Sequence, residues 1–234
     1  KIIGAVIVSN SKSGLRNEKK YYKSENFYIP NWYNHLKYTL PVDDKIREKL
    51  RRELDIGDDS LVFISLGGNW SYKNYNLIIS AISNLGKDTK AIYLQIGPDE
   101  DKQLLKLKRE LNLKNNVKLI GQVDDVIPYL YASDVYIMPS SIEGFGVAAV
   151  EAMGSGLPAI LSNRPALFDF KEDSNEIVFI EPNINEIAKS INFFLKMDKH
   201  EIKKKGIMLS KLISKKYSIE KGAQKLVKLY LNGY

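Results

Sequence analysis

Cysteine is absent from the 234-residue chain, and histidine occurs only as His35 and His200. The absence of cysteine excludes disulfides, thiolate metal sites and cysteine nucleophiles, and two histidines are too few to favour a histidine-based zinc site. No uncharged apolar run is long enough to cross a bilayer, and no signal-peptide pattern opens the chain. Because the first residue is Lys1 and not Met, we interpret the chain as a piece of a longer protein, which we expect to be cytoplasmic.

A strong charge of one sign is also missing from most of the chain. Residues from Lys199 to Tyr234 contain ten lysines and two acids, a surplus of +8, whereas the whole chain carries +7, so the residues before Lys199 sum to −1. A uniformly basic nucleic-acid binder would not show this distribution, and we expect no nucleic-acid partner. A solvated helical face is the usual reason for such a surplus; peripheral contact of these C-terminal basic helices with the inner face of an anionic membrane is the alternative. The last expected helix carries its lysines on one face, at Lys221, Lys225 and Lys228.

Hydrophobic residues make up 44% of the chain and charged residues 27%, which is enough apolar material for a conventional soluble core. Between the expected strands lie segments in which apolar residues have helical spacing, such as Leu77 to Ile82 and Leu104 to Leu111. Strands buried on both faces that alternate with helices predict an α/β fold, a doubly wound, Rossmann-like parallel sheet covered on each side. The six apolar runs of strand length are Leu61–Leu66, Ala91–Ile96, Val117–Ile120, Val135–Met138, Ala159–Leu161 and Ile177–Ile180.

The opening stretch differs from this regular part. We interpret residues 1–40 as a remnant of a preceding domain, with a short strand at Gly4–Val8, followed by an interdomain linker. Residues 41–234 would form the Rossmann-like domain together with its C-terminal helices. The other expected helices are Asp43–Leu54 on the surface, one that follows Asn183 in a capping box with Glu186, one near Lys199–Leu212 and one at Ser218–Leu231.

The most informative motif follows the expected strand Val135–Met138. It runs from Pro139 to Pro158 and holds the sequence Gly144-Phe145-Gly146 where a helix should begin. Glycines there let the backbone approach a ligand closely, and the first N–H groups of a helix have no internal partners. Together with the positive end of the helix dipole, these free donors favour a phosphate site.

The same motif contains two carboxylates, Glu143 and Glu151, with seven residues between them. Glu151 lies about one and a half turns into the expected helix and can accept hydrogen bonds from a vicinal diol such as a ribose. Glu143, on the loop before the helix, can accept from sugar hydroxyls. Taken alone, the two acids would indicate a helix-terminal charge and a surface acid. The flanking glycines and the small-residue exit Gly154-Ser155-Gly156 favour a binding site instead.

In these residues the chain resembles the C-terminal domain of retaining glycosyltransferases of the large group 1 (family 4) class, which have the GT-B fold. The resemblance extends from Ile29 to the C-terminus, and its most specific part is the Glu-x7-Glu motif of Glu143 and Glu151. Asp169 stands where the family usually has Glu. Further matches follow in order at Ile29-Pro30-Asn31, Lys73-Asn74, Gly97-Pro98, Val117–Gly121, Ala132–Val135, Pro139-Ser140 and Tyr217-Ser218.

The resemblance implies a nucleotide-diphosphate sugar as donor and transfer with retention to a saccharide or lipid-linked acceptor, in surface polysaccharide or glycoconjugate synthesis. It implies Glu143 and Lys73 as catalytic residues, with Lys73 neutralising the diphosphate leaving group, and Glu151 as the ribose ligand. No metal and no separate cofactor is implied. The implied donor-binding residues are Gly67, Gly68, Lys73, Gly97, Gly121, Gln122, Val123, Glu143, Gly144, Phe145, Gly146, Val147 and Glu151.

The chain departs from the family pattern in two places and lacks a large part of it. The family usually has Arg at the place of Gly68 and Gly at the place of Trp32, and loss of the Arg should weaken phosphate binding. The acceptor-binding domain would precede this chain, so we expect the isolated chain to transfer almost nothing. Trp70 could stack on a ligand or cover the first core helix, and both interpretations stay open. Asp124-Asp125 are expected to cap a helix at Val126–Tyr131 and not to bind a metal.

Three other functions compete with this interpretation. A non-catalytic sugar-nucleotide-binding or assembly module of the same fold is favoured by the missing Arg and opposed by Lys73, Glu143 and Glu151. Another GT-B enzyme, such as a nucleotide-sugar epimerase, is opposed by the Glu-x7-Glu motif. A dinucleotide-dependent dehydrogenase is disfavoured because no G-x-G-x-x-G follows the first strand of the regular part.

Overall fold

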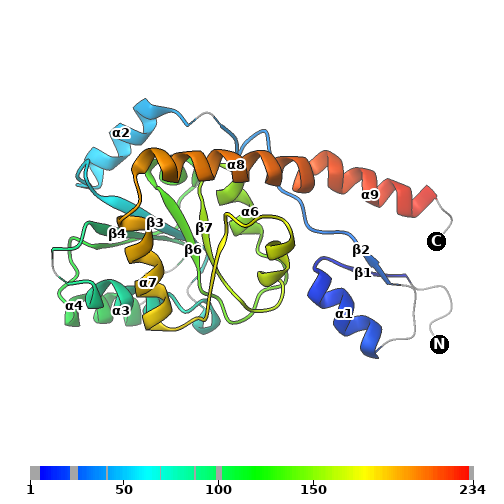
Figure 1. Ribbon diagram of the computed structural model, residues 1–234, viewed down its shortest axis with the longest axis horizontal. Coiled ribbons are helices and arrows are strands. Elements are labelled where there is room, and N and C mark those ends of the chain that lie inside the picture. The colour runs from blue at the N-terminus through cyan, green and yellow to red at the C-terminus, as the bar shows by residue number, and fades with distance from the viewer. Residues whose placement is uncertain are drawn as a thin grey trace.

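A six-stranded, all-parallel sheet forms the centre of the protein (Figure 1). The computed structural model describes residues 6–21, 26–40, 42–68, 70–86, 88–98 and 102–231. The sheet order is β5-β4-β3-β6-β7-β8, so the chain starts near the middle and winds outwards in both directions. The strands are β3 (Leu61–Leu66), β4 (Ala91–Ile96), β5 (Val117–Gly121), β6 (Val135–Met138), β7 (Ala159–Ser162) and β8 (Val178–Ile180).

Helices cover both faces of this sheet, as the doubly wound fold requires. Val62 and Ile64 of β3 pack into one core layer, whereas Leu61 and Phe63 pack into the other, because successive side chains of a strand point to opposite faces. The first layer is closed by α5 (Ile127–Ala132), α6 (Val147–Gly154) and α8 (Lys199–Tyr217). The second is closed by α3 (Tyr75–Asn84), α4 (Lys102–Glu110) and α7 (Ile184–Leu195). The predicted fold class is therefore confirmed.

Helix α2 (Asp44–Glu53) is attached to the sheet through the carboxylate of Asp134. Arg47 donates to Asp134 at 2.6 Å, and the buried Arg51 donates to it at 3.4 Å. The same carboxylate accepts the backbone N–H of Val62 at 2.7 Å. Asp134, one of the residues that carried the sequence resemblance, therefore organises the fold and not a ligand site.

The described residues between Val6 and Tyr28 form a small unit of their own. Strands β1 (Ile7–Ser9) and β2 (Asn26–Tyr28) pair in parallel, and α1 (Lys12–Tyr21) connects them (Figure 1). Of the strand expected at Gly4–Val8, the first two residues lie outside the described residues, Val6 precedes the strand, and the strand runs from Ile7 to Ser9. The linker that follows is fastened to the larger unit, since Tyr33 bridges to Ser218. The placement of a domain boundary at residue 40 stays a prediction.

Side-chain caps begin several helices, as expected, but the two predicted capping arrangements need correction. Asn183 accepts the N–H of Glu186 at 2.9 Å, yet Glu186 pairs with Lys189 at 2.7 Å, while the N–H of Asn183 donates to the carbonyl of Glu181. The capping box is thus only half formed. Helix α5 begins at Ile127, and Asp125 accepts its N–H at 3.3 Å, so the acid nearer to the helix provides the contact.

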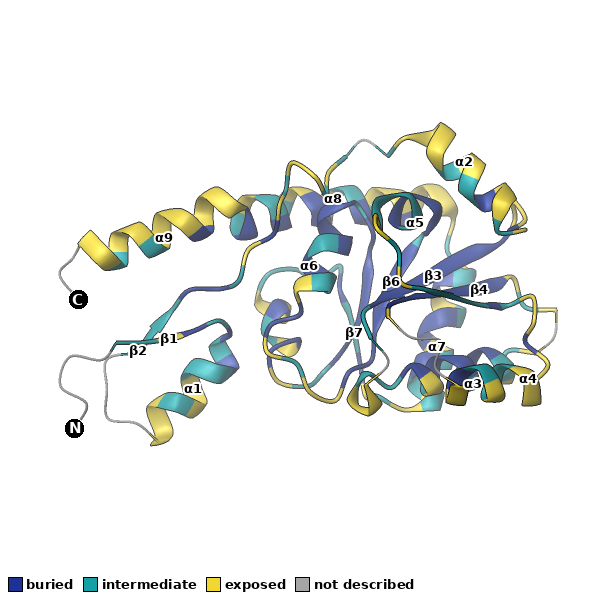
Figure 2. Cartoon of the chain, turned by 180° about the vertical axis from the view of Figure 1, so that it is seen from behind, coloured by how far each residue is buried: buried dark blue, intermediate teal, exposed yellow. Residues whose placement is uncertain are grey.

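The last two helices run almost as one rod (Figures 1 and 2). Helix α8 continues beyond the expected Leu212 to Tyr217, and α9 (Ile219–Leu231) follows after a single extended residue, Ser218. Along α9 most side chains are exposed, and Gly222 is the one buried residue of the helix. A Cβ there would lie 2.1 Å from the ring of Trp32, so the linker tryptophan packs on this glycine. No helix in the described part of the chain has the length and apolarity to span a membrane.

Candidate functional site

The ends of β3, β4 and β5 meet at one edge of the sheet, and glycines hold their loops together. The N–H of Gly67 donates to Ile96 at 2.8 Å, and the N–H of Gly97 donates to the carbonyl of Gly121 at 3.0 Å. A Cβ on Gly97 would lie 2.1 Å from the Gly67 carbonyl oxygen, so no larger residue fits without moving backbone. The three glycines predicted to follow these strands therefore line one continuous backbone ridge at the carboxyl edge, where open parallel sheets place ligands.

The loop between β6 and α6 exposes the beginning of a helix at the same edge. Gly146 occupies the N-cap position with φ of +93°, a left-handed conformation that favours glycine, and it has no side chain to cap the helix. The N–H groups of Ala149 and Val150 bond back to Gly146, whereas Val147 and Ala148 belong to the first turn, whose N–H groups have no intrahelical acceptor. An anion is the natural partner of such donors.

The neighbours of Gly146 have different roles in this loop. Gly144 is exposed and faces Asn10 of the small unit, 3.7 Å from where its Cβ would be. Phe145 is 4% exposed and packs edge-on against Phe170 and Tyr217, at ring separations of 5.4 and 5.5 Å. Of the predicted site residues in this loop, Phe145 can therefore offer a ligand only its backbone, because its side chain anchors the loop to the core.

Lys73 and Glu143, predicted as catalytic residues, are in direct contact. The Lys73 Nζ lies 2.6 Å from Oε1 of Glu143, and the two side chains are 15% and 11% exposed. Hydrogen bonds between the loop after β3 and the loop after β6 hold these two residues together. Asn74, in the left-handed region with φ of +59°, donates from Nδ2 to the Pro139 carbonyl and to Ser141 Oγ, both at 2.8 Å. The N–H of Ser141 donates in return to the carbonyl of Tyr72 at 2.8 Å.

Glu151 lies on α6 and is half-buried beside the linker. Burial raises the pKa of Glu151 above its ordinary value, although a hydrogen bond with Tyr38 and the charge of Lys37 lower it in part. Burial, and after it the charge of Glu151, raise the pKa of Tyr38 to about 12. Lys37 also pairs with Asp125 at 3.3 Å. The linker therefore crosses next to Glu151 and ties it to the loop after β5, where Gln122 is exposed and Val123 is half-buried.

Asp169 connects the small unit to the larger one. Its carboxylate accepts the N–H of Ser13 at 2.8 Å, the Ser13 hydroxyl at 2.7 Å and a guanidinium N–H of Arg16 at 2.9 Å. Lys12 and Glu172 form an ion pair beside it. Sequence reasoning noticed Asp169 only as a departure from a family pattern and missed Tyr38 altogether. No local sequence pattern predicts either contact. Ser13 and Arg16, for example, are each more than 150 positions away from Asp169 in the chain.

Trp70 does not cover the first core helix. It is 64% exposed, and its Nε1 lies 3.2 Å from where a Cβ on Gly68 would be, a position that Pro98 of the loop after β4 also approaches. Of the two interpretations left open by the sequence, the structural one is therefore wrong. The histidines lie elsewhere: His35 faces Glu220 at 3.3 Å, and the N–H of His200 donates to Asp198 at the start of α8.

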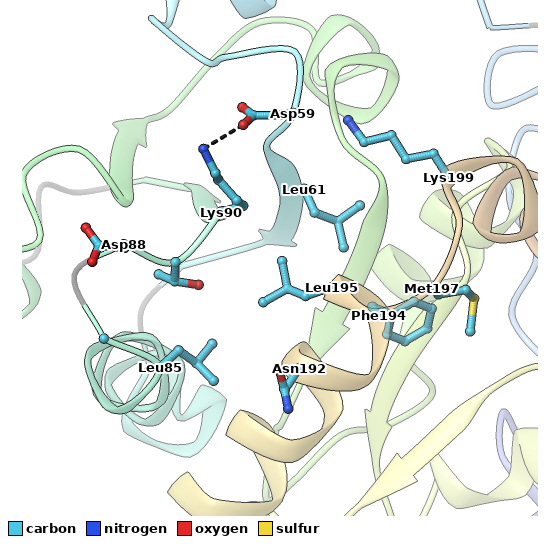
Figure 3. A pocket seen from close by; sticks show the side chains of 12 residues that line it. Asp59, Leu61, Leu85, Asp88, Lys90, Asn192, Phe194, Leu195, Met197 and Lys199 are labelled. Atoms are coloured by element: carbon cyan, nitrogen blue, oxygen red, sulfur yellow. Dashed lines mark ion pairs between the residues drawn. The ribbon is translucent and has the colours of Figure 1, made fainter.

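A separate hollow of about 440 Å³ lies at the opposite, amino edge of the sheet (Figure 3). It is flanked by the exposed ion pair of Asp59 and Lys90, whose atoms are 2.6 Å apart, and by apolar side chains such as Leu61 and Phe194. None of the predicted site residues lines it. The described residues also contain no group of three or more histidines or acids placed to hold a metal ion.

The carboxyl edge thus combines one cation, the start of a helix and two carboxylates. Lys73 and the first turn of α6 suit an anionic group, whereas Glu143 and Glu151 suit hydroxyl groups on either side of it. The sequence of the chain matches the family described as "Glycosyl transferases group 1" over residues 46–207, which is more than half of its length.

The chain belongs to the group 1 glycosyl transferases.

Two curated relatives and one solved structure illustrate how far the similarity of this group 1 glycosyl transferase extends. Protein CapJ of Staphylococcus aureus is 31% identical over 149 residues, which are 62% of this chain and 38% of CapJ. The UDP-Gal:alpha-D-GlcNAc-diphosphoundecaprenol alpha-1,3-galactosyltransferase of Escherichia coli is 32% identical over 143 residues, which are 58% of this chain and 36% of that enzyme. The chain therefore spans less than half the length of these curated relatives.

The crystal structure of HepE from Anabaena in complex with UDP and glucose matches the present fold with a TM-score of 0.86. The match covers 97% of this chain and 63% of HepE at 19% sequence identity. At that identity the likeness establishes the shared fold. It includes the small unit as well as the six-stranded sheet, since almost the whole group 1 glycosyl transferase chain is covered.

Proposed function

We propose that this chain binds a nucleotide-diphosphate sugar and is the donor-binding part of a retaining glycosyltransferase of surface polysaccharide or glycoconjugate synthesis. The contact of Lys73 with Glu143, beside the open first turn of α6, carries the proposal. It puts a cation, free N–H donors and a hydroxyl acceptor at one point of the carboxyl edge. HepE, which shares the fold, was crystallised with UDP and glucose, and this supports a nucleotide-sugar donor.

The donor would lie along the edge from β5 towards β6. The base would meet the backbone of Gly121–Val123, and the ribose hydroxyls would donate to Glu151 on α6. The diphosphate would lie between the first turn of α6 and Lys73, and Glu143 would accept from hydroxyls of the sugar. These roles suit the observed burial, because Glu151 is desolvated enough to have a raised pKa and gains from a new pair of hydrogen-bond donors.

Transfer would break the bond between the anomeric carbon and the diphosphate oxygen. Negative charge then grows on the leaving diphosphate, and Lys73 and the α6 dipole stabilise it more in the transition state than in the bound substrate. The acceptor hydroxyl attacks the anomeric carbon on the face that the leaving group vacates, which gives retention, and its proton leaves with the diphosphate. A saccharide or lipid-linked acceptor would be held by a domain other than the six-stranded sheet unit.

We further propose that no metal takes part, because Lys73, which contacts Glu143 beside the first turn of α6, would supply the positive charge that a divalent cation provides to a diphosphate elsewhere. A thermal-shift panel of UDP-, GDP- and ADP-sugars tests donor binding, since a ligand stabilises the state that binds it. We expect one nucleotide class to raise the melting temperature equally with and without EDTA. Absence of a shift with all three classes would refute donor binding, and loss of the shift in EDTA would refute the metal-free part.

A non-catalytic sugar-nucleotide-binding module is the second candidate, and the absence of a side chain at Gly68 favours it, because a phosphate-binding cation is missing there. The full-length protein separates the two candidates. Release or transfer of labelled sugar from the donor that binds would support the enzyme. Tight binding without release or transfer, for the wild type and for Lys73→Ala alike, would support the module.

A further inference from the structure

Trp70 has no role in the core, although a tryptophan side chain gains much from burial. It is 64% exposed, and it precedes the short helix η1 (Ser71–Lys73) that brings Lys73 to Glu143. Trp70 is in the loop after β3. Because β3 lies between β4 and β6 in the sheet, this loop lies between the Gly97-Pro98 turn after β4 and the loop after β6 at the carboxyl edge. An exposed indole in this place borders the region between the base end and the sugar end of the proposed donor site.

Gly68 and Trp70 are matched to each other. A Cβ on Gly68 would lie 3.2 Å from Nε1 and 3.7 Å from Cδ1 of Trp70, and 3.6 Å from Cγ of Pro98. Gly67 needs its left-handed φ of +123°, whereas Gly68 has no such conformation, so the backbone does not require glycine there. A side chain at position 68 would therefore be tight against the N–H edge of the indole, which would have to shift by a few tenths of an ångström. Among the residues that the structure describes, this N–H finds no acceptor.

We propose that Trp70 is a binding residue of the donor site, whose indole N–H donates to the diphosphate of the bound nucleotide sugar. The inference rests on the proposed function and deepens it, because it names a contact at the diphosphate that this chain makes without a cation at position 68. A hydrogen bond from a neutral N–H group to a charged oxygen is stronger than one to a neutral acceptor. The ring then covers the diphosphate from the side of Pro98 and reduces its exposure to water.

Affinity measurements separate the hydrogen bond from the ring. Trp70→Phe keeps an aromatic ring and removes the N–H, whereas Trp70→Ala removes both. For UDP, GDP or ADP, whichever the wild type binds, we expect Trp70→Phe to weaken binding about tenfold, as loss of a hydrogen bond to a charged group does. Trp70→Ala should weaken it further. The matching nucleoside, measured by competition, should bind both variants as it binds the wild type; an equal loss for nucleoside and diphosphate would overturn the proposal.

Fluorescence reports the contact directly, because the chain has only two tryptophans. Trp32, in the linker, packs against Gly222 of α9, so Trp32→Phe leaves Trp70 as the single tryptophan reporter. We expect the diphosphate to change the emission of Trp32→Phe with the dissociation constant found by calorimetry, and to leave the emission of Trp70→Phe unchanged. A response from Trp32 alone would overturn the proposal.

The match between Gly68 and Trp70 gives a third, independent test. In the wild-type background the Cβ of Gly68→Arg lies tight against the indole, which occupies the space beside it, so we expect a smaller gain in diphosphate affinity than in the Trp70→Ala background. In the Trp70→Ala background the same change finds free space and brings a cation to the phosphates, so affinity should rise at least fivefold over Trp70→Ala, since charge-assisted bonds are strong. An equal effect of Gly68→Arg in both backgrounds would contradict the matched pair.

The outcomes distinguish the inference from the function on which it rests. Binding of a nucleoside diphosphate that is unchanged in Trp70→Phe and Trp70→Ala overturns the role of Trp70 and leaves the proposed function intact. Failure of the wild type to bind any of the three diphosphates overturns both. Melting curves of each variant provide the folding control, and because Trp70 is mostly exposed we expect the curves of Trp70→Phe and Trp70→Ala to coincide with the wild-type curve.

Discussion

The ion pair of Lys73 and Glu143 should be a measurable part of the stability of the free protein. Its atoms are 2.6 Å apart, and the side chains are only 15% and 11% exposed. Breaking a fully buried pair by removing one partner costs about 3–5 kcal/mol, because the remaining charge loses its compensation. Since both residues here keep some contact with solvent, we expect Lys73→Met and Glu143→Gln each to cost about 2 kcal/mol.

The chain offers a matched control for this prediction. Lys90 and Asp59 also form a 2.6 Å ion pair, but these side chains are 61% and 66% exposed. Exposed pairs contribute roughly 0–1 kcal/mol, because water screens the charges and the side chains lose entropy. Lys90→Met and Asp59→Asn should therefore change the free energy of unfolding much less than the substitutions at Lys73 and Glu143.

Urea unfolding of the single and double variants measures the change in the free energy of unfolding. Thermal unfolding is a second measurement, in which a destabilisation of about 2 kcal/mol lowers the melting temperature of a domain of this size by roughly 4–8 °C. The double variant Lys73→Met/Glu143→Gln should cost less than the sum of the single variants, with a coupling of about 1–2 kcal/mol. Equal costs for the buried and the exposed pair, or additive single variants at Lys73 and Glu143, would refute this reasoning.

Four further predictions concern the site and the isolated chain. Glu151→Gln should weaken nucleotide binding by about 1–3 kcal/mol, measured by calorimetry, because the ribose loses a charged acceptor; unchanged affinity would remove Glu151 from the site. The same variant should be more stable than the wild type at pH 7 but not at pH 4. Because burial raises the pKa of Glu151, the free energy of unfolding of the wild type falls as the pH rises above about 4.5. A stability difference that does not depend on pH would contradict this cost of burying the charged carboxylate. In the full-length protein, Lys73→Ala should lower kcat more than it raises KM, and an effect on KM alone would exclude a transition-state role. The isolated chain should bind donor yet transfer almost no sugar to a lipid or saccharide acceptor, with or without EDTA, because we propose that a domain other than the six-stranded sheet unit orients the acceptor hydroxyl; robust transfer by the chain alone would refute this.

Much of the fold could be predicted because burial has a local signature. Runs such as Leu61–Leu66 and Ala91–Ile96 are apolar except for one polar residue each, Ser65 and Gln95, and the structure buries every position of both strands. Glycines after these strands mark where the chain leaves the sheet, and Gly146 marks where a helix begins. In the regular part the differences lie mainly at ends of elements, such as α8, which continues to Tyr217 because nothing in its sequence stops the helix before Ser218. In the opening stretch the structure adds α1 and β2, which the polar, lysine-rich sequence did not predict.

The candidate site was predictable only in part. The family resemblance predicts Lys73 and Glu143 as two separate site residues. The structure brings them together through the hydrogen bonds of Asn74 and Ser141. The side chain of Phe145 could not be oriented from the sequence, since Gly144-Phe145-Gly146 is equally compatible with a ring in the site and a ring in the core. Packing against Phe170 and Tyr217 decides for the core.

By itself the sequence determined the doubly wound parallel sheet, the edge at which we propose that a ligand binds and the kinds of group present there, because periodicity and glycine placement depend on near neighbours in the chain. Only the tertiary structure decided which side chains meet: Tyr38 with Glu151, Ser13 with Asp169, and Trp70 with the space above Gly68. Such contacts join residues of separate elements, and the partner of a polar or aromatic side chain depends on how those elements pack. A pattern of residues along the chain records that a side chain is to be buried or exposed, but not what it will touch.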